Sequence, residues 1–116
     1  MRVWLDDRRS PHPDPDSWEW VRTPAEAIAL LLTGKVTELS LDHDLGLFEG
    51  DRELTGNDVV SWMERAVVTE GFVPPDTIAV HSANAAAAPR MEAGIEAVRR
   101  LAKRGRPCQQ QTTPAG

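Results

Sequence analysis

The chain has 116 residues, 41% of them hydrophobic and 27% charged, which is typical of a globular protein with one domain and one core. Its net charge of −5 works against an extended nucleic-acid footprint, because such binding relies on Lys and Arg that neutralise phosphates. The single cysteine excludes an internal disulfide and a metal site built from cysteines.

Two short strands are predicted at the start of the chain. Residues 1–5 form an apolar run that ends abruptly in charged residues, as a buried strand does where it leaves a sheet. Residues 10–17 contain three prolines and few apolar side chains, so we expect a loop there and a second strand over 19–22.

A helix is predicted after the second strand. Thr23 is a suitable N-cap, Pro24 suits the first helical position, and Glu26 lies where its side chain can reach back to the cap. Gly34 is placed to end this helix, and residues 36–41 alternate well enough to form a third strand.

The second half of the chain is predicted to hold two more helices and one strand. Residues 45–55 show no periodicity, and we expect them to form a long loop that faces a substrate. Apolar residues at helical spacing follow Gly56 and stop at Gly71, which predicts a second helix. A fourth strand is expected over 77–80, and a last helix begins within 86–89, because proline is tolerated only in the first turn.

This order of elements predicts an α/β fold with a mostly parallel sheet and helices on its faces. In such sheets, ligands bind beyond the carboxyl ends of the strands. Polar residues that follow three of the predicted strands should therefore meet along one edge, which we call the rim. They are Asp6, Asp7, Asp42, His43, His81 and Ser82.

Three carboxylates at the rim indicate a metal site. Asp6, Asp7 and Asp42 would repel one another unless a cation or a proton shared the site. Oxygen ligands with space for water suit Mg²⁺, and nearby imidazoles also permit Mn²⁺. The alternative is that these acids only cap a turn and a loop.

Two histidines at the rim are candidates for acid–base catalysis, because imidazole titrates near neutral pH. A lone histidine is more often structural. His43 and His81, however, stand at the ends of two strands beside acids and a hydroxyl, which favours a catalytic role for at least one of them. Asp42, next to His43 in the sequence, completes the predicted catalytic set.

Four further residues are candidates for binding a phosphate. Ser82 can donate to a phosphate oxygen, although a serine at this place can also be a nucleophile. Asn84 can contact a ligand or cap the last helix, whose N-terminus would itself favour an anion. Arg8 and Arg90 can hold a phosphate through the planar guanidinium group, and either can equally pair with the acids.

The pattern resembles a response-regulator receiver domain. Asp6–Asp7 is similar to the metal-binding acid pair of receivers, Asp42 to their phosphate-accepting aspartate, and Ser82–Ala83 to their hydroxyl–alanine step. Receivers also keep a lysine at the end of a fifth strand, whereas the last lysine here, Lys103, lies in the predicted final helix. The resemblance implies a flavodoxin-like, three-layer sandwich whose fifth strand is weak or missing.

A more specific resemblance is to the cyclic-phosphate processing receiver family. It rests on the segments Leu5–Arg8, Ser40–Gly46, Thr55–Gly56, His81–Asn84 and Arg90–Met91. The resemblance implies a metal-dependent hydrolase of the phosphodiesterase type. Its substrates would be cyclic phosphates of nucleotides or of RNA ends.

Two other functions are compatible with the same residues. One is a signalling receiver that accepts phosphate on Asp42, against which the missing lysine counts. The other is a module that binds a cyclic nucleotide or phosphate without turnover.

The sequence also leads to expectations about domain bounds, partners and localisation. Residues 1–106 should form the domain and 107–116 a flexible tail. The missing fifth strand leaves a sheet edge that the tail, a cover or a second copy in a homodimer would protect. The partner is a small phosphorylated substrate or an RNA terminus. Without a membrane-length apolar run or a signal peptide, we expect a cytoplasmic protein with no membrane contact.

Overall fold

The computed structural model describes residues 1–12 and 14–115, with side chains described as far as Arg104. The strands are β1 (Arg2–Leu5), β2 (Glu19–Val21), β3 (Glu38–Leu41), β4 (Asp44–Glu49), β5 (Arg52–Thr55) and β6 (Thr77–Val80). The helices are α1 (Pro24–Leu31), α2 (Gly56–Glu70) and α3 (Ala88–Ala115), with a short 3-10 helix, η1 (Pro15–Ser17).

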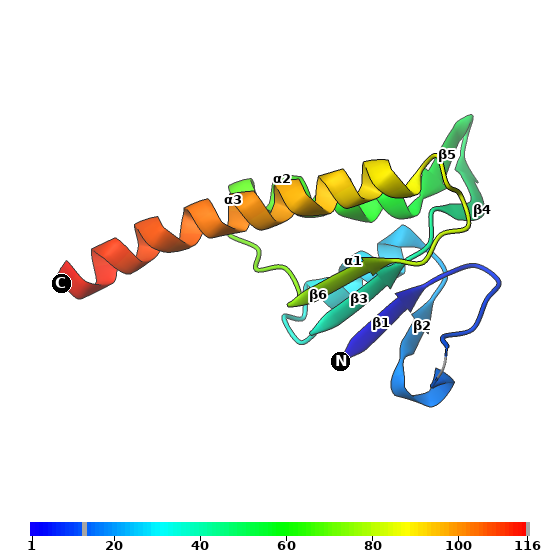
Figure 1. The fold of residues 1–116 in the computed structure, drawn as a ribbon, viewed down its shortest axis with the longest axis horizontal. Coiled ribbons are helices and arrows are strands. Elements are labelled where there is room, and N and C mark those ends of the chain that lie inside the picture. Colours follow the sequence, from blue (N-terminus) through cyan, green and yellow to red (C-terminus); the bar gives the residue numbers. More distant parts are fainter. Residues whose placement is uncertain (13, 116) are drawn as a thin grey trace.

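Four strands form one parallel sheet in the order β2-β1-β3-β6 (Figure 1). All four were predicted from the sequence, with ends displaced by two residues at most. The receiver-like α/β fold is therefore confirmed. Among the described residues this sheet ends at β6, as expected for a receiver whose fifth strand is missing.

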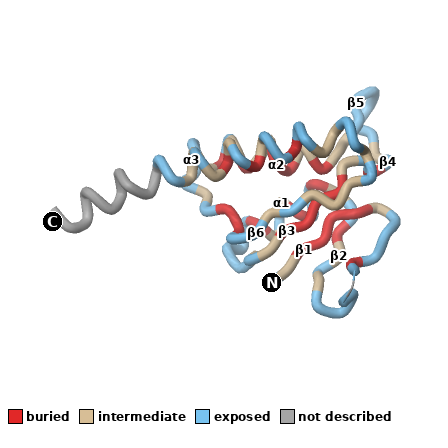
Figure 2. The backbone as a smooth tube through the Cα atoms, in the orientation of Figure 1, coloured by how far each residue is buried: buried red, intermediate tan, exposed pale blue. Residues whose placement is uncertain are grey.

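One face of the sheet packs against all three helices (Figure 1). Alternate strand residues point to this face, so a single core cluster joins the sheet to the helices, and Figure 2 shows the buried backbone concentrated between them. The fully buried members include Val3, Leu5, Leu39, Leu41, Val59, Val60, Met63, Met91 and Val98. This packing fixes where the carboxyl ends of the strands lie.

The opposite face is covered over β1 by the connection between β1 and β2, whereas Ala79 of β6 is exposed on it. Trp4 and Ser40 are register partners on this face, and both are buried. Trp4 donates from Nε1 to the carbonyl oxygen of Arg9 at 2.9 Å, and its ring meets Trp18 edge to face at 5.5 Å. Over β1 this segment takes the place of the third layer of the predicted sandwich, and η1 is its only helical turn within the described residues.

The expected long loop over 45–55 is wrong, because β4 and β5 form an antiparallel hairpin there. Leu45 is buried in the core, and the pairing is irregular between Asp44 and Leu47, where Gly46 adopts a φ of +63°. This irregularity interrupts the alternation by which a strand is recognised in a sequence. Gly50 turns the hairpin with a φ of +64°.

The predicted helix starts are confirmed by their caps. The Thr23 hydroxyl accepts from the backbone N–H of Glu26 at 3.1 Å, and Pro24 is the first residue of α1. Thr55 caps α2 in a reciprocal capping box, and Gly71 ends it with a φ of +68°.

The start of α3, at Ala88, lies within the predicted range. The tail predicted at 107–116 falls among residues whose side chains are outside the described part, and it stays a prediction. Among the described residues, no helix combines the length and the apolar character needed to cross a membrane.

Candidate functional site

The rim residues are held in place by backbone hydrogen bonds that continue the sheet. The N–H of Asp6 donates to the carbonyl of Val21 on β2, at 3.1 Å. The N–H of Asp42 donates to that of Leu5, at 3.0 Å, and the N–H of His81 to that of Leu41, at 2.9 Å. The residue after each strand therefore still belongs to the ladder, and its side chain starts from a rigid position.

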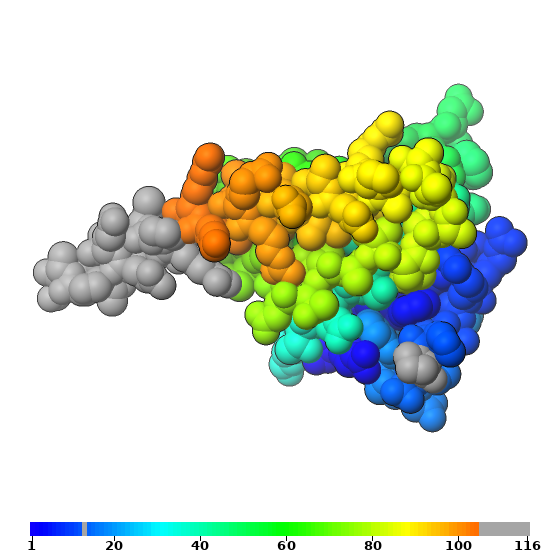
Figure 3. Space-filling model, viewed as in Figure 1, coloured from blue at the N-terminus to red at the C-terminus, as the bar shows by residue number. Residues whose placement is uncertain are grey.

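Three rim side chains converge on one point. One ligand atom from each of Asp6, Asp42 and His81 lies within 4.8 Å of the others. We call these three residues the acid–imidazole cluster. Figure 3 shows the segments after β1 and β6, blue and yellow, meeting at one end of the molecule. Residues far apart in the sequence thus form a single site.

Asp6 is anchored by the backbone of its own loop. Its Oδ1 accepts from the N–H groups of Arg8 and Arg9, both at 2.9 Å, and its side chain is buried. Burial raises the pKa of Asp6, but hydrogen bonds from Arg9, Arg8 and His81 and the charge of Arg9 outweigh it, so the net shift is downward. Asp6 is therefore ionised at neutral pH.

Asp42 is less well compensated. It is 6% exposed, and its Oδ1 accepts from the backbone N–H of His43 at 2.9 Å. Burial raises the pKa of Asp42, and the nearby charge of Asp6 raises it further. The two carboxylates lie close together, and the pKa of one of them is raised. Such a site favours an added cation.

Both ring nitrogens of His81 have partners. Its Nε2 lies 3.1 Å from Oδ2 of Asp6, its Nδ1 lies 2.7 Å from the Ser40 hydroxyl, and its ring stacks on Trp4 at 3.8 Å. Burial lowers the pKa of His81 and outweighs the carboxylates that favour its charged form, so the ring is neutral at neutral pH. Nε2–H then donates to Asp6, and Nδ1 accepts from Ser40.

This donor set fits a divalent metal. Two carboxylates and one imidazole are ligands of such ions in proteins. The Ser40 hydroxyl can accept as well as donate. His81 can therefore carry its proton on Nδ1, donate it to Ser40, and leave the Nε2 lone pair for the metal. Asp6, Asp42 and His81 would hold the ion.

Asp7 is not a member of the acid–imidazole cluster but belongs to its surroundings. It lines the same cavity, of about 360 Å³, together with Asp6, Asp42 and Asp44. One of its carboxylate oxygens is 3.5 Å from Nε of Arg8. Asp7 is thus placed to contact a ligand of this cavity.

His43 lies beside the cavity and is tied to it through Asp44. Its Nδ1 is 2.7 Å from Oδ1 of Asp44, while the Asn84 amide donates to both oxygens of the same carboxylate at 3.3 Å. The His43 bond lowers the pKa of Asp44, which is therefore ionised at neutral pH and accepts from Nδ1–H. The other nitrogen of His43, Nε2, has no hydrogen bond among the described residues.

The four predicted phosphate-binding residues do not all lie at the cavity. Asn84 caps the turn that leads into α3, since its Oδ1 accepts from the N–H groups of Ala86 and Ala87, and Ser82 accepts from the N–H of Asn84 at 3.0 Å. Arg8 lines the cavity and is largely exposed. Arg90 is exposed on α3 and is not among the residues that line the cavity.

Two residues of the site were missed by sequence analysis. Arg9 approaches Asp6 and Asp42, at 3.2 and 3.5 Å. Ser40 holds His81 from within β3. A polar residue at a buried position of a central strand was the available signal for Ser40, whereas nothing in the sequence distinguishes Arg9 from Arg8.

Gly56 allows the backbone of Asp42 to pack tightly against the start of α2. A Cβ at this position would lie 1.8 Å from the carbonyl oxygen of Asp42. The N–H of Gly56 donates to the carbonyl of His43 at 3.0 Å. Only glycine fits here, so the first residue of α2 fixes the backbone of Asp42 and His43.

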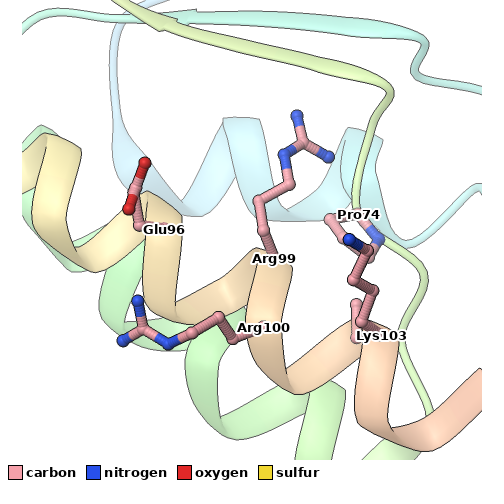
Figure 4. Close-up of a pocket in the computed structure, with 6 residues that line it drawn as sticks. Pro74, Glu96, Arg99, Arg100 and Lys103 are labelled. Carbon is pink, nitrogen blue, oxygen red and sulfur yellow. The ribbon is translucent and has the colours of Figure 1, made fainter.

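A second cavity, of about 380 Å³, lies beside α3 and is lined by Pro74, Glu96, Arg99, Arg100, Ala102 and Lys103 (Figure 4). Arg99 is structural, because its guanidinium donates to the carbonyls of Pro75 and Asp76 at 2.7 and 2.8 Å. These bonds tie α3 to the segment before β6, at the end of the sheet opposite the rim.

The family model of the cyclic-phosphate processing receiver domain matches residues 1–97. No curated protein and no solved structure matches the chain. The matched segment contains the whole sheet, the hairpin and every member of the acid–imidazole cluster. The chain belongs to the cyclic-phosphate processing receiver family.

Proposed function

We propose that this domain is a metal-dependent hydrolase that opens cyclic phosphates of nucleotides or of RNA ends. The observation that carries the proposal is the acid–imidazole cluster, whose two buried carboxylates and imidazole lie within 4.8 Å of one another. Family membership supports cyclic phosphate as the substrate class.

Mg²⁺ or Mn²⁺ is the proposed cofactor, held by Asp6, Asp42 and His81, with Asp7 beside them. When bound, the ion would neutralise the charge that develops on the phosphoryl oxygens. Arg8, which lines the cavity, and Ser82, which follows β6, are the proposed phosphate contacts.

The contacts favour His43 over His81 as the proton carrier. His81 is neutral, only 15% exposed and bonded through both nitrogens, which suits a metal ligand. His43 keeps Nε2 available while Asp44 orients its ring, the arrangement of a general base. In the proposed step, water attacks the phosphorus and gives a proton to His43, the bond to one ring oxygen breaks, and that oxygen takes the proton back from His43 to become a hydroxyl.

Hydrolysis can be tested with 2′,3′-cyclic nucleotides and with RNA ending in a cyclic phosphate. Phosphorus NMR in the presence of Mg²⁺ or Mn²⁺ should show conversion to a phosphate monoester, and a chelator should stop it. His43→Ala and His81→Ala should both abolish turnover, whereas His12→Ala, at the exposed third histidine, should retain it. Full turnover in both of the first two variants would refute the proposal.

The signalling alternative gains no support from the contacts. The two lysines of the sequence are Lys35, whose carbonyl binds the N-terminus, and Lys103, beside the α3 cavity, so neither serves Asp42. Incubation with a small phosphodonor followed by intact-mass measurement distinguishes the two functions. A mass gain that disappears in Asp42→Asn would favour a phosphate-accepting receiver.

A further inference from the structure

One guanidinium group contacts all three members of the acid–imidazole cluster. Nε of Arg9 lies 3.2 Å from Oδ2 of Asp6, and Nη2 lies 3.5 Å from Oδ1 of Asp42. Nη2 also donates to the carbonyl oxygen of His81 at 3.3 Å. Arg9 therefore occupies the position of a counter-cation to the two carboxylates.

The carboxylate oxygen that Arg9 holds is also the one a metal would need. Oδ1 of Asp6 is committed to two backbone N–H groups, which leaves Oδ2 as the oxygen free to change partners. That Oδ2 is the atom bonded to Arg9 and to His81. A divalent cation bound here would repel the guanidinium at close range.

The side chain of Arg9 can leave without disturbing the fold. Its N–H is bonded to Asp6 and its carbonyl oxygen to Trp4, so the backbone is anchored on both sides. The side chain itself is 53% exposed, lines the cavity of the site and is not part of the hydrophobic core cluster. Movement of this side chain is therefore a rotamer change at the surface.

We infer that Arg9 exchanges with the metal. In the metal-free protein it neutralises Asp6 and Asp42, and on metal binding its guanidinium leaves them and turns to the phosphate of the substrate. A planar guanidinium suits a phosphate, and the departure places it beside the reacting group. This inference rests on the proposed function, because it assumes the same metal site and the same class of substrate.

Metal affinity tests the exchange directly. Titration of Mn²⁺ by calorimetry should show that Arg9→Gln binds the ion about tenfold more tightly than the parent, because two partly exposed ion pairs no longer compete. Arg8→Gln removes the same charge one residue away, where the contact is to Asp7 alone, and should change the affinity by about twofold at most. A gain in Arg9→Gln no larger than that in Arg8→Gln would overturn the inference.

Two further readouts separate exchange from a merely structural role. The Nε–H resonance of Arg9 should shift on addition of Mg²⁺ while that of Arg99, at the opposite end of the sheet, stays in place. Inorganic phosphate should bind the Mg²⁺-loaded Arg9→Gln variant more weakly than the loaded parent, opposite to the effect on metal. An unmoved Arg9 resonance, or equal phosphate binding, would contradict the inference.

The outcomes also distinguish this inference from the proposed function. A parent protein that binds neither Mn²⁺ nor Mg²⁺ would refute the metal site itself. A parent that binds metal and hydrolyses cyclic phosphate, with no gain of affinity in Arg9→Gln, would refute the exchange alone.

Discussion

Replacing Asp42 with Asn should stabilise the metal-free protein. The ligand atoms of Asp42 and Asp6 lie within 4.8 Å, and Coulomb repulsion at this separation is about 3.5 kcal/mol with an effective dielectric constant of about 20. Arg9 offsets part of this energy, but its side chain is half exposed and screened by water. We therefore expect a net gain of about 1–2 kcal/mol in the free energy of unfolding, or about 3–8 °C in Tm.

Asn preserves the other contacts of this position. Its amide oxygen can still accept the backbone N–H of His43. Thermal unfolding in the presence of a chelator, followed by circular dichroism, measures the difference. A Tm for Asp42→Asn at or below that of the parent would refute the account of charge repulsion in the acid–imidazole cluster.

Metal should reverse the order of stability. With free Mn²⁺ at about 100 times its Kd, the parent gains about 2.7 kcal/mol, whereas the variant lacks one of the two carboxylate ligands and gains much less. The parent should then unfold at the higher temperature. Unchanged ranking in saturating Mn²⁺ would show that Asp42 does not bind the ion.

The advantage of Asp42→Asn should also depend on pH. Because the pKa of Asp42 is raised in the folded protein, the folded state binds this proton more tightly than the unfolded chain does. The penalty in the parent is therefore absent below the usual pKa of 3.8, grows as the pH rises through the folded value, and is complete above it. The difference in Tm between variant and parent should shrink toward zero on acidification, and a constant difference from neutral to acidic pH would contradict this linkage.

Three other substitutions test the supporting contacts of the site. Gly56→Ala places a Cβ 1.8 Å from the carbonyl of Asp42, so it should destabilise the fold by several kcal/mol, about 3 or more, and the measurement is urea unfolding. Ser40→Ala removes the partner of His81 and should weaken Mn²⁺ binding by about 10-fold or more in calorimetry. Asp44→Asn should lower kcat and leave Mn²⁺ affinity nearly unchanged, and an equal loss of both would place Asp44 among the metal ligands.

The sheet and the helix starts could be predicted because their signals are local. Strands of a parallel sheet are short apolar runs. Thr23 and Thr55 are typical N-cap residues, so each indicates the helix that follows it. Convergence of Asp6, Asp42 and His81 could also be predicted, since topology alone brings the carboxyl ends of parallel strands together.

The hairpin and the role of Arg9 could not be predicted, for different reasons. The bulge near Gly46 removes the alternating pattern of β4, so the segment resembles a loop in sequence. Arg8 and Arg9 are chemically identical neighbours. Only the path of the loop, anchored by Trp4, decides that Arg9 faces the carboxylates while Arg8 points to solvent.

The order of the strands makes the complete site depend on three strands at once. His81 reaches Asp6 across 75 positions of sequence, with β3 between the strands that carry them. A partially unfolded molecule that loses β6 or β1 keeps at most two of the three ligands of the cluster, so the complete site exists only while all three strands are paired. Bound metal would consequently protect the slowest-exchanging backbone amides of β1, β3 and β6 together, and hydrogen exchange with and without Mg²⁺ would register the site as a property of the whole sheet.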